Sequence, residues 1–327
     1  MHSPALAEIE QQAKNLAARL HRTPVWAWDT PLKNKLLGDG IRVIFKLELF
    51  QRTGSFKARG ALTVMDHLSP EEKTRGVVAG SGGNHGIAVA FAAHSAGVSA
   101  KIIVPRSINP FRLEAITAYG AAIIQVEHMG AALEEMRRIA GDEGRAIMHP
   151  FENPLIALGT GTLGHEFLRQ IPDLDMVIVP IGGGGLAAGA ACAVKQINPR
   201  CQIIGVEPRN ANSMFLSLQA GKPVALPAPP HSIADSLCAP RAEPYSFALC
   251  QQYLDDVVLV EEDDMRAAMK ILFEDLKLAV EAAGATATAG LLAPLKERCR
   301  GLKIGAVVCG SNIDAQSFQQ CLIPTAL

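Results

Sequence analysis

A lysine between an aromatic residue and a small one is the first residue in this sequence that could do chemistry. Lys57 lies in residues 53–60 (TGSFKARG), here called the Lys57 turn, between the apolar, strand-like run 43–49 and a helical pattern that begins near Ala61. Burial in such a turn would disfavour the ammonium form, lower the pKa of the amine and free it for covalent chemistry. The alternative is a lysine at the start of a helix that merely points into water.

Three other loops carry polar or glycine-rich residues, and each follows a predicted strand. They are the Asn84 loop (residues 81–86, SGGNHG), the glycine loop (residues 182–185, GGGG) and the Cys309 loop (residues 309–312, CGSN). Open α/β sheets bind ligands at the carboxyl ends of their strands. The N–H groups of the Asn84 loop suit a carboxylate, and four glycines let a phosphate approach the backbone at a helix N-terminus closely. The alternatives are ordinary glycine turns and a buried core thiol at Cys309.

The glycine loop also allows a different interpretation. Gly182, Gly184 and Ala187 satisfy a loose dinucleotide fingerprint, and Glu207 follows at roughly the distance expected for a ribose contact. A nicotinamide-dependent oxidoreductase is therefore an alternative on local grounds. That alternative gives the Lys57 turn and the Asn84 loop no role, whereas a phosphate-bearing cofactor attached to a lysine would use all four loops.

The elements that must position these loops alternate between strand and helix patterns. Short apolar runs at 76–79, 101–105, 122–126, 175–180, 202–206, 256–260 and 303–308 read as buried strands, with helical patterns between most of them. Such alternation predicts parallel βαβ units and an α/β fold. Residues 222–243, rich in proline, form the one long irregular connection that we expect.

Composition excludes several function classes. The 31 basic and 32 acidic residues nearly cancel, so we expect neither a nucleic-acid nor a membrane partner. Glycine, proline or charge interrupts every apolar run before it could span a bilayer, and residues 1–20 follow a helical period and not a signal-peptide layout. The seven cysteines show no disulfide or metal-binding spacing, which predicts a cytoplasmic protein.

Taken together, the four motifs resemble the fold-type II pyridoxal-phosphate enzymes and, among them, the serine/threonine dehydratase and serine racemase family. The resemblance runs from about Thr23 to Asp314, with the motifs in the family's order. It implies an α/β fold with two open, twisted, mostly parallel sheets flanked by helices, and pyridoxal phosphate in the cleft between two domains. Residues 1–70 and 150–327 would form the large cofactor-binding domain and residues 71–149 the small one. The resemblance also implies a homodimer without a C-terminal regulatory domain.

Each motif residue has an expected role by this resemblance. Lys57 would carry the cofactor covalently and remove the Cα proton of an amino-acid substrate. The residues expected to bind the cofactor are Phe56, Lys57, Asn84, Gly182, Gly183, Gly184, Gly185 and Cys309. Those expected to bind the substrate are Ser55, Ser81, Gly82, Asn84, His85 and Ser236.

Two positions separate elimination from racemisation. Cys309 would face the pyridine nitrogen, and a thiol does not protonate the ring as a carboxylic acid would, so a weak electron sink favours prompt loss of a β-hydroxyl group. Gly82 stands where serine racemases carry a second serine. We therefore expect dehydration and deamination of a β-hydroxy-L-amino acid such as threonine or serine to a 2-oxo acid and ammonia. Phenylserine or hydroxyaspartate as substrate, and an amino-acid racemase, are the alternatives.

Other departures from the family concern a cation and the substrate pocket. Glu207 and Ala211 match two ligands of the family's cation site, but Ser213 stands where relatives have aspartate, so a monovalent or divalent cation is left open. Thr160 replaces a glutamine, and Ser236 a common glycine. We expect both near the substrate.

Overall fold

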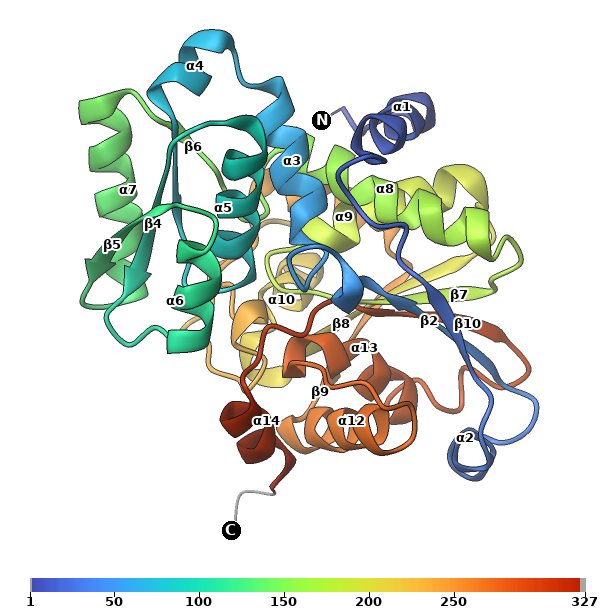
Figure 1. The fold of residues 1–327 in the computed structure, drawn as a ribbon. Helices are drawn as coiled ribbons and strands as arrows, with labels where there is room; N and C mark the ends of the chain where they lie inside the picture. Colours follow the sequence, from blue (N-terminus) through green and yellow to red (C-terminus); the bar gives the residue numbers. More distant parts are fainter. Residues whose placement is uncertain (1, 324–327) are drawn as a thin grey trace.

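The strands of the protein form two separate sheets in the computed structural model, which describes residues 2–323 (Figure 1). A six-stranded sheet has the order β1-β2-β10-β7-β8-β9, and a four-stranded sheet has the order β5-β4-β3-β6. Every pairing is parallel except that of β1 with β2. The expected α/β fold with two open, mostly parallel sheets is confirmed.

The bounds of the elements follow the chain. The strands are β1 (Val25–Trp28), β2 (Arg42–Leu47), β3 (Val77–Gly80), β4 (Ala100–Pro105), β5 (Ala122–Val126), β6 (Ala146–Ile147), β7 (Met176–Pro180), β8 (Gln202–Pro208), β9 (Asp256–Val260) and β10 (Lys303–Val308). The α-helices are α1 (Leu6–Leu16), α2 (Pro31–Leu37), α3 (Lys57–His67), α4 (Pro70–Arg75), α5 (Asn84–Ala96), α6 (Pro110–Thr117), α7 (Met129–Glu143), α8 (Pro154–Gln170), α9 (Gly185–Ile197), α10 (Ser213–Ala220), α11 (Pro244–Tyr253), α12 (Glu262–Glu274), α13 (Ala282–Leu292) and α14 (Ala315–Leu322). Three short 3₁₀ helices are η1 (Glu48–Phe50), η2 (Arg209–Ala211) and η3 (Asp235–Leu237).

The smaller sheet is covered by helices on both faces. Along β4, Ile102 and Val104 join the hydrophobic core beneath α5, whereas Ile103 between them joins the core beneath α7. This alternation follows from the two-residue period of a strand, which sends successive side chains to opposite faces. Helix α6 packs on α5 beside the same sheet.

The larger sheet is buried on both faces, so its central strand is apolar throughout. All five residues of β7 (MVIVP) are buried, as expected for a parallel strand between helices. Helix α13 packs against β7, β8, β9 and β10. Small residues allow α8 and α9 to pack closely against each other. A Cβ added to Gly189 of α9 would lie only 2.7 Å from the backbone nitrogen of Gly161 in α8, so there is no room for a side chain.

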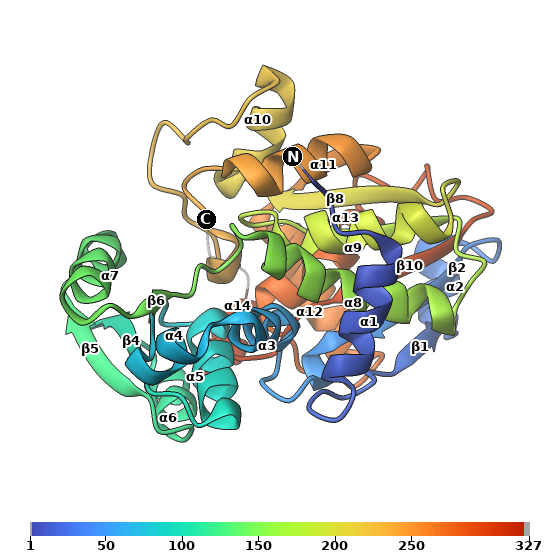
Figure 2. The same ribbon diagram turned by 90° about the horizontal axis from the view of Figure 1, so that it is seen from above.

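Helix α3, which begins at Lys57, lies between the two sheets (Figure 2). It packs against α8 beside the larger sheet and against α5 beside the smaller one. Its buried residues Leu62 and Met65 belong to the core that α5 shares. The division of the chain into two domains stays a prediction, and α3 contacts both of the expected units.

Several elements differ from the sequence-based expectation. The sequence analysis assigned no helix to residues 26–36, but there the structure has helix α2, which follows β1. The N-terminus of α2 is capped by Thr30, whose Oγ1 accepts a hydrogen bond from Lys33 N. The sequence analysis also did not predict β6, α11 or α14. All of these elements are short, and short segments give weak periodicity.

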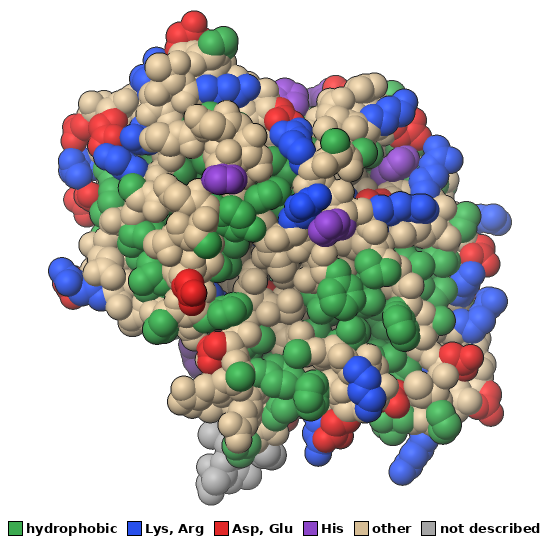
Figure 3. Space-filling view, viewed as in Figure 1, with side chains coloured by type: hydrophobic (Ala, Val, Ile, Leu, Met, Phe, Trp, Pro, Cys, Tyr) green, Lys and Arg blue, Asp and Glu red, His purple; other side chains and the backbone are tan. Residues whose placement is uncertain are grey.

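The face shown in Figure 3 carries charged side chains of both signs mainly around its edge, with hydrophobic side chains towards its middle. Among residues 2–323, no helix combines the length and apolar character needed to cross a membrane.

A buried ionic network anchors the start of α3 to β2 and α8. The Arg59 guanidinium donates through Nη2 and Nε to the Glu48 carboxylate, at 2.7 and 2.8 Å, and lies 3.2 Å from Glu166. Lys46 Nζ, fully buried, donates to the other Glu166 oxygen at 2.5 Å. Thr23 Oγ1 donates to Glu48 at 2.5 Å. Two cations therefore neutralise two anions, and the network fixes the backbone two residues beyond Lys57.

Removing one member of this network should destabilise the fold strongly. We expect Glu48→Ala to lower the free energy of unfolding by about 3–5 kcal/mol, because it leaves the Arg59 charge buried with only Glu166 near it. Urea denaturation followed by circular dichroism measures the effect. As a control, Asp142→Ala removes an exposed partner of Arg138 and should leave the midpoint unchanged. Equal effects of the two substitutions would contradict the structural role assigned to the network.

Candidate active site

The four loops singled out in the sequence meet at the carboxyl ends of β2, β3, β7 and β10. They line a cavity of about 1160 Å³ and a smaller one beside it. The residues that line both cavities are Lys57, Asn84, Phe151, Gly183 and Ser236. The two cavities therefore form one continuous site between the sheets.

The Lys57 amine is held inside this site. Its Nζ donates a hydrogen bond to Pro150 O at 2.6 Å and lies 5.2 Å from the centre of the Phe56 ring. Burial lowers the pKa of Lys57 to about 8, against a smaller opposing effect of Cys309. A substantial fraction of the amine is thus neutral near physiological pH and available as a nucleophile or base.

Backbone hydrogen bonds join the Lys57 turn to the Cys309 loop. Phe56 N donates to Cys309 O at 3.1 Å, and Ser311 N donates to Gly54 O at 2.9 Å. Gly54 has a φ of +70°, and a Cβ there would collide with the Asn312 side chain. The turn therefore requires glycine at this position.

Cys309 is buried and lines the smaller cavity together with the glycine loop. Its Sγ donates a hydrogen bond to Ala283 O at 3.4 Å. Burial, with the nearby Glu281 carboxyl group, raises the pKa of the Cys309 thiol far above its usual range. The group at this position is therefore a neutral thiol whose hydrogen is already engaged.

The glycine loop presents backbone to the smaller cavity. It connects β7 to α9, and Gly184 has a φ of +91°. A Cβ on Gly182 would lie 2.9 Å from Leu237 Cα, and one on Gly183 would collide with the Phe151 ring. N–H groups at the start of a helix, without side chains in the way, form a suitable phosphate site.

The Asn84 loop connects β3 to α5 and is fixed by its polar side chains. Asn84 Nδ2 donates to Glu281 Oε1 at 2.5 Å, and Asn84 Oδ1 accepts from Asn312 Nδ2 at 2.6 Å. His85 Nε2 lies 2.8 Å from Met148 O, and burial lowers the pKa of His85 to about 3. His85 is thus a neutral tether.

The expected substrate residues divide into two groups. Ser81, Gly82, Asn84, His85 and Ser236 all line the larger cavity. Ser55 lines neither cavity, and its buried Oγ has no hydrogen-bond partner among the described residues. Thr160, expected near the substrate, lies beneath the glycine loop, where its Oγ1 donates to Gly185 O at 2.7 Å.

Glu207 serves the backbone of α10. Its two carboxylate oxygens accept hydrogen bonds from Met214 N at 2.9 Å and Phe215 N at 2.7 Å. Glu207 lines neither cavity, so it cannot meet a ribose of a dinucleotide bound there. This geometry removes the main support for the nicotinamide alternative.

The expected cation ligands suit a divalent ion poorly. Glu207, Ala211 and Ser213 offer one carboxylate, one backbone carbonyl and one hydroxyl group, and burial raises the pKa of Glu207 to about 8. Within residues 2–323, no cluster of three or more His, Cys, Asp or Glu side chains could hold a metal ion. Cation binding stays a prediction, and no step below depends on it.

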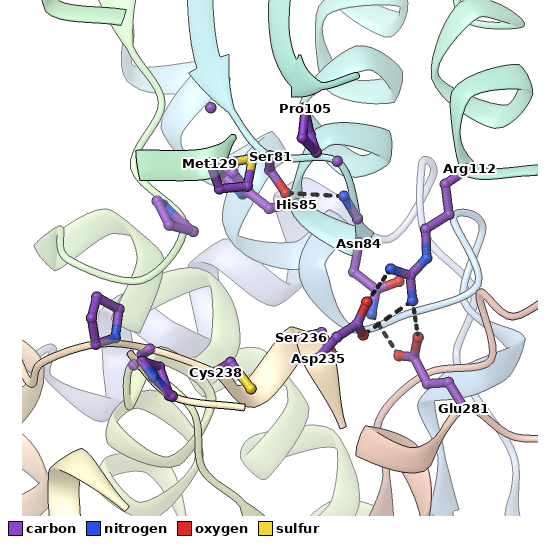
Figure 4. A pocket seen from close by; sticks show the side chains of 18 of the residues that line it. Ser81, Asn84, His85, Pro105, Arg112, Met129, Asp235, Ser236, Cys238 and Glu281 are labelled. Atoms are coloured by element: carbon purple, nitrogen blue, oxygen red, sulfur yellow. Dashed lines mark hydrogen bonds and ion pairs between the residues drawn. The ribbon is translucent and has the colours of Figure 1, made fainter. Parts of the chain in front are cut away.

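Three charged residues in the larger cavity were missed by the sequence analysis. Arg112 on α6 forms an ion pair with Asp235 of η3 and lies 3.7 Å from Glu281, which directly precedes α13 (Figure 4). A single acid just before an alanine-rich, buried helix could have indicated Glu281. Nothing in the local sequence marks Arg112 or Asp235.

Comparison with known proteins agrees with this geometry. The sequence profile of a family described as pyridoxal-phosphate dependent enzyme matches residues 20–310. Phenylserine dehydratase of Ralstonia pickettii is 45% identical over 310 residues, which cover 94% of each chain. L-Threonine ammonia-lyase of Thermotoga maritima is 35% identical, with 97% of this chain and 78% of that protein covered. The structure of maize serine racemase superposes with a TM-score of 0.91 at 34% identity and covers 98% of this chain and 97% of its own.

The site has what pyridoxal phosphate requires. Lys57 supplies a partly neutral amine, the glycine loop supplies backbone N–H groups at a helix N-terminus, and Cys309 supplies a polar atom in the same cavity. The chain belongs to the fold-type II pyridoxal-phosphate-dependent enzymes, in the family of serine/threonine dehydratases and serine racemases.

Proposed function

We propose that the protein is an ammonia-lyase that eliminates the β-hydroxyl group of a β-hydroxy-L-amino acid and yields a 2-oxo acid and ammonia. The observation that carries the proposal is the pairing of a partly neutral Lys57 amine with a neutral Cys309 thiol across one cavity. Pyridoxal phosphate, when bound, supplies an electron sink for the pair of electrons left at the substrate Cα. Lys57, Asn84, the glycine loop and Cys309 would hold it.

Lys57 is suited to the proton transfer that elimination needs. A general base works best when its pKa lies near the operating pH, and burial brings the pKa of Lys57 to about 8. The amine would take the Cα proton while the Cβ–O bond breaks. The hydroxyl group leaves with a proton as water, and hydrolysis of the remaining enamine product releases ammonia.

Cys309 supports elimination over racemisation. Its Sγ hydrogen is engaged by Ala283 O, and its raised pKa keeps the thiol neutral, so it does not donate a proton to a ring nitrogen. The carbanion is then only weakly stabilised, which favours rapid loss of a β-substituent. Gly82, without a side chain, faces Pro105 and Ile108 and offers no proton to the other face of the substrate.

The larger cavity favours a bulky, uncharged β-substituent. Its volume is about 1160 Å³, and Pro105, Ile108, Met129 and the proline-rich segment 227–230 form apolar parts of its wall. The charge of Arg112 is offset by Asp235 and Glu281, so little positive potential remains for a second substrate carboxylate. Together with the likeness to a phenylserine dehydratase, this supports phenylserine as a substrate above hydroxyaspartate.

Replacing Lys57 tests the covalent role. We expect Lys57→Ala to abolish the visible absorption of the lysine-bound cofactor and to reduce kcat/KM at least about 100-fold, because it removes both the anchor and the base. Absorption spectra before and after borohydride reduction, with a coupled keto-acid assay, measure both effects. Lys101→Ala, in β4, is the matched control and should retain both. A coloured Lys57→Ala protein, or a colourless wild type that binds NADH, would refute the assignment.

A substrate panel tests the reaction and its specificity. We expect phenylserine to give 2-oxo acid and ammonia in equal amounts, with a kcat/KM at least about tenfold above that of serine, because the apolar wall contacts the ring. Hydroxyaspartate should be the poorest of phenylserine, threonine, serine and hydroxyaspartate. Chiral chromatography of recovered serine checks for the D-isomer. Accumulation of D-serine without keto acid would establish a racemase and overturn the proposal.

A further inference from the structure

The first turn of helix α6 reaches across the larger cavity to the other sheet. Arg112 forms an ion pair with Asp235 of η3, and its Nε donates to Asn312 O at 3.1 Å. Asn109 Nδ2 donates to Asp314 Oδ2 at 2.6 Å. These contacts join a helix beside the smaller sheet to two segments beside the larger sheet, η3 and residues 312–314, so they exist only when α6 is seated against them.

Glu281 is an incompletely satisfied carboxyl group beside these contacts. Its side chain is 3% exposed, and Oε1 accepts the Asn84 hydrogen bond at 2.5 Å. Oε2 is buried and has no hydrogen-bond partner among the described residues, and the nearest cation, Arg112 Nη2, is 3.7 Å away. In Figure 4 dashed lines join the Arg112 guanidinium to both the Asp235 and the Glu281 carboxyl groups.

The charge of Glu281 depends on its neighbours. Burial raises the pKa of Glu281 to about 7, while Arg112 lowers this pKa and Asp235 raises it. On its other side Glu281 faces Cys309, whose thiol stays neutral because its pKa is far above the usual range. Displacement of Arg112 would therefore leave the carboxyl group protonated near neutral pH.

Asn84 connects this carboxyl group to the cofactor site. The Asn84 amide donates to Glu281 through Nδ2, accepts from Asn312 through Oδ1, and lines both cavities. With Oδ1 engaged, the second Nδ2 hydrogen is the group that Asn84 can present to the cofactor. The first Nδ2 hydrogen is donated to Glu281, and an ionised Glu281 polarises the Asn84 amide differently from a protonated one.

We propose that Arg112, Glu281 and Asn84 form a charge relay, in which seating of α6 sets the charge of Glu281 and thereby the electrostatic environment of the bound cofactor. Arg112 and Glu281 act as positioning residues through Asn84. The relay requires pyridoxal phosphate in this site but does not depend on which reaction the enzyme catalyses. It links the closed arrangement of the two sheets to the electronic state of the cofactor.

Variants with opposite expected effects test the relay. The holoenzyme is titrated between pH 5 and 9, and two signals are followed: the visible absorption of the bound cofactor and the NMR resonance of the Asn84 side-chain amide. That resonance is assigned from its absence in the Asn84→Asp variant. Wild type should show a transition near pH 7, the pKa of Glu281. Arg112→Met should move it up by about one pH unit, because a stabilising cation is lost. Asp235→Asn should move it down, because a like charge is lost and Arg112 then pairs with Glu281 alone.

Three further variants complete the test. Glu281→Gln should abolish the transition in both signals, and Arg112→Lys should restore the wild-type midpoint at least in part. Arg241→Met removes another arginine that lines the cavity but pairs with Glu243, and should leave the midpoint unchanged. A transition that persists in Glu281→Gln, or shifts of the same sign in Arg112→Met and Asp235→Asn, would overturn the relay. Because no substrate is used, these outcomes are independent of the proposed elimination.

Discussion

The site depends on removing the Lys57 amine from water without pairing it with a carboxylate. A nearby carboxylate would raise the pKa of the amine, whereas burial lowers it to about 8. The neighbours of Nζ meet this requirement, since they are the Pro150 carbonyl, the Phe56 ring and a neutral thiol. The charges that hold this region together, on Lys46, Glu48, Arg59 and Glu166, pair with one another and not with Lys57.

The same constraint explains why so much of the site is backbone. A phosphate that approaches the glycine loop needs N–H groups, and a lysine or arginine there would add positive charge beside the amine. The sequence has four glycines at this place. Leu237 and Phe151 are packed too closely for a Cβ at Gly182, Gly183 and Gly185, and Gly184 has a positive φ. We therefore expect specificity to come from the larger cavity, which Met129, Ile108 and the proline-rich segment line.

Much of this site could be predicted because its chemistry is local in the sequence. Lys57, the Asn84 loop, the glycine loop and Cys309 each sit at the end of a strand whose apolar pattern is clear, and parallel strands bring such ends to one edge. Arg112 could not be predicted, since its partner Asp235 lies 123 residues away and neither residue differs locally from a surface charge. Thr160 is the opposite case. Its position in the family suggested a place near the substrate, but in the structure it lies beneath the glycine loop, where its Oγ1 donates to Gly185 O. Helices α11 and α14 were missed for the related reason that tertiary packing, more than periodicity, stabilises short helices.

Glu207 and Glu281 show how environment separates two acids with similar sequence contexts. Burial raises the pKa of both, yet two backbone N–H groups at the start of α10 occupy both Glu207 oxygens, and Glu207 lines neither cavity. Glu281 lines the larger cavity, and one of its oxygens has no hydrogen bond among the described residues and lies 3.7 Å from Arg112 of helix α6. Since Asp235 and Glu281 together offset Arg112, a substrate carboxylate finds no free cation among these three. We therefore expect the N–H groups of the Asn84 loop, at the N-terminus of α5, to bind that carboxylate.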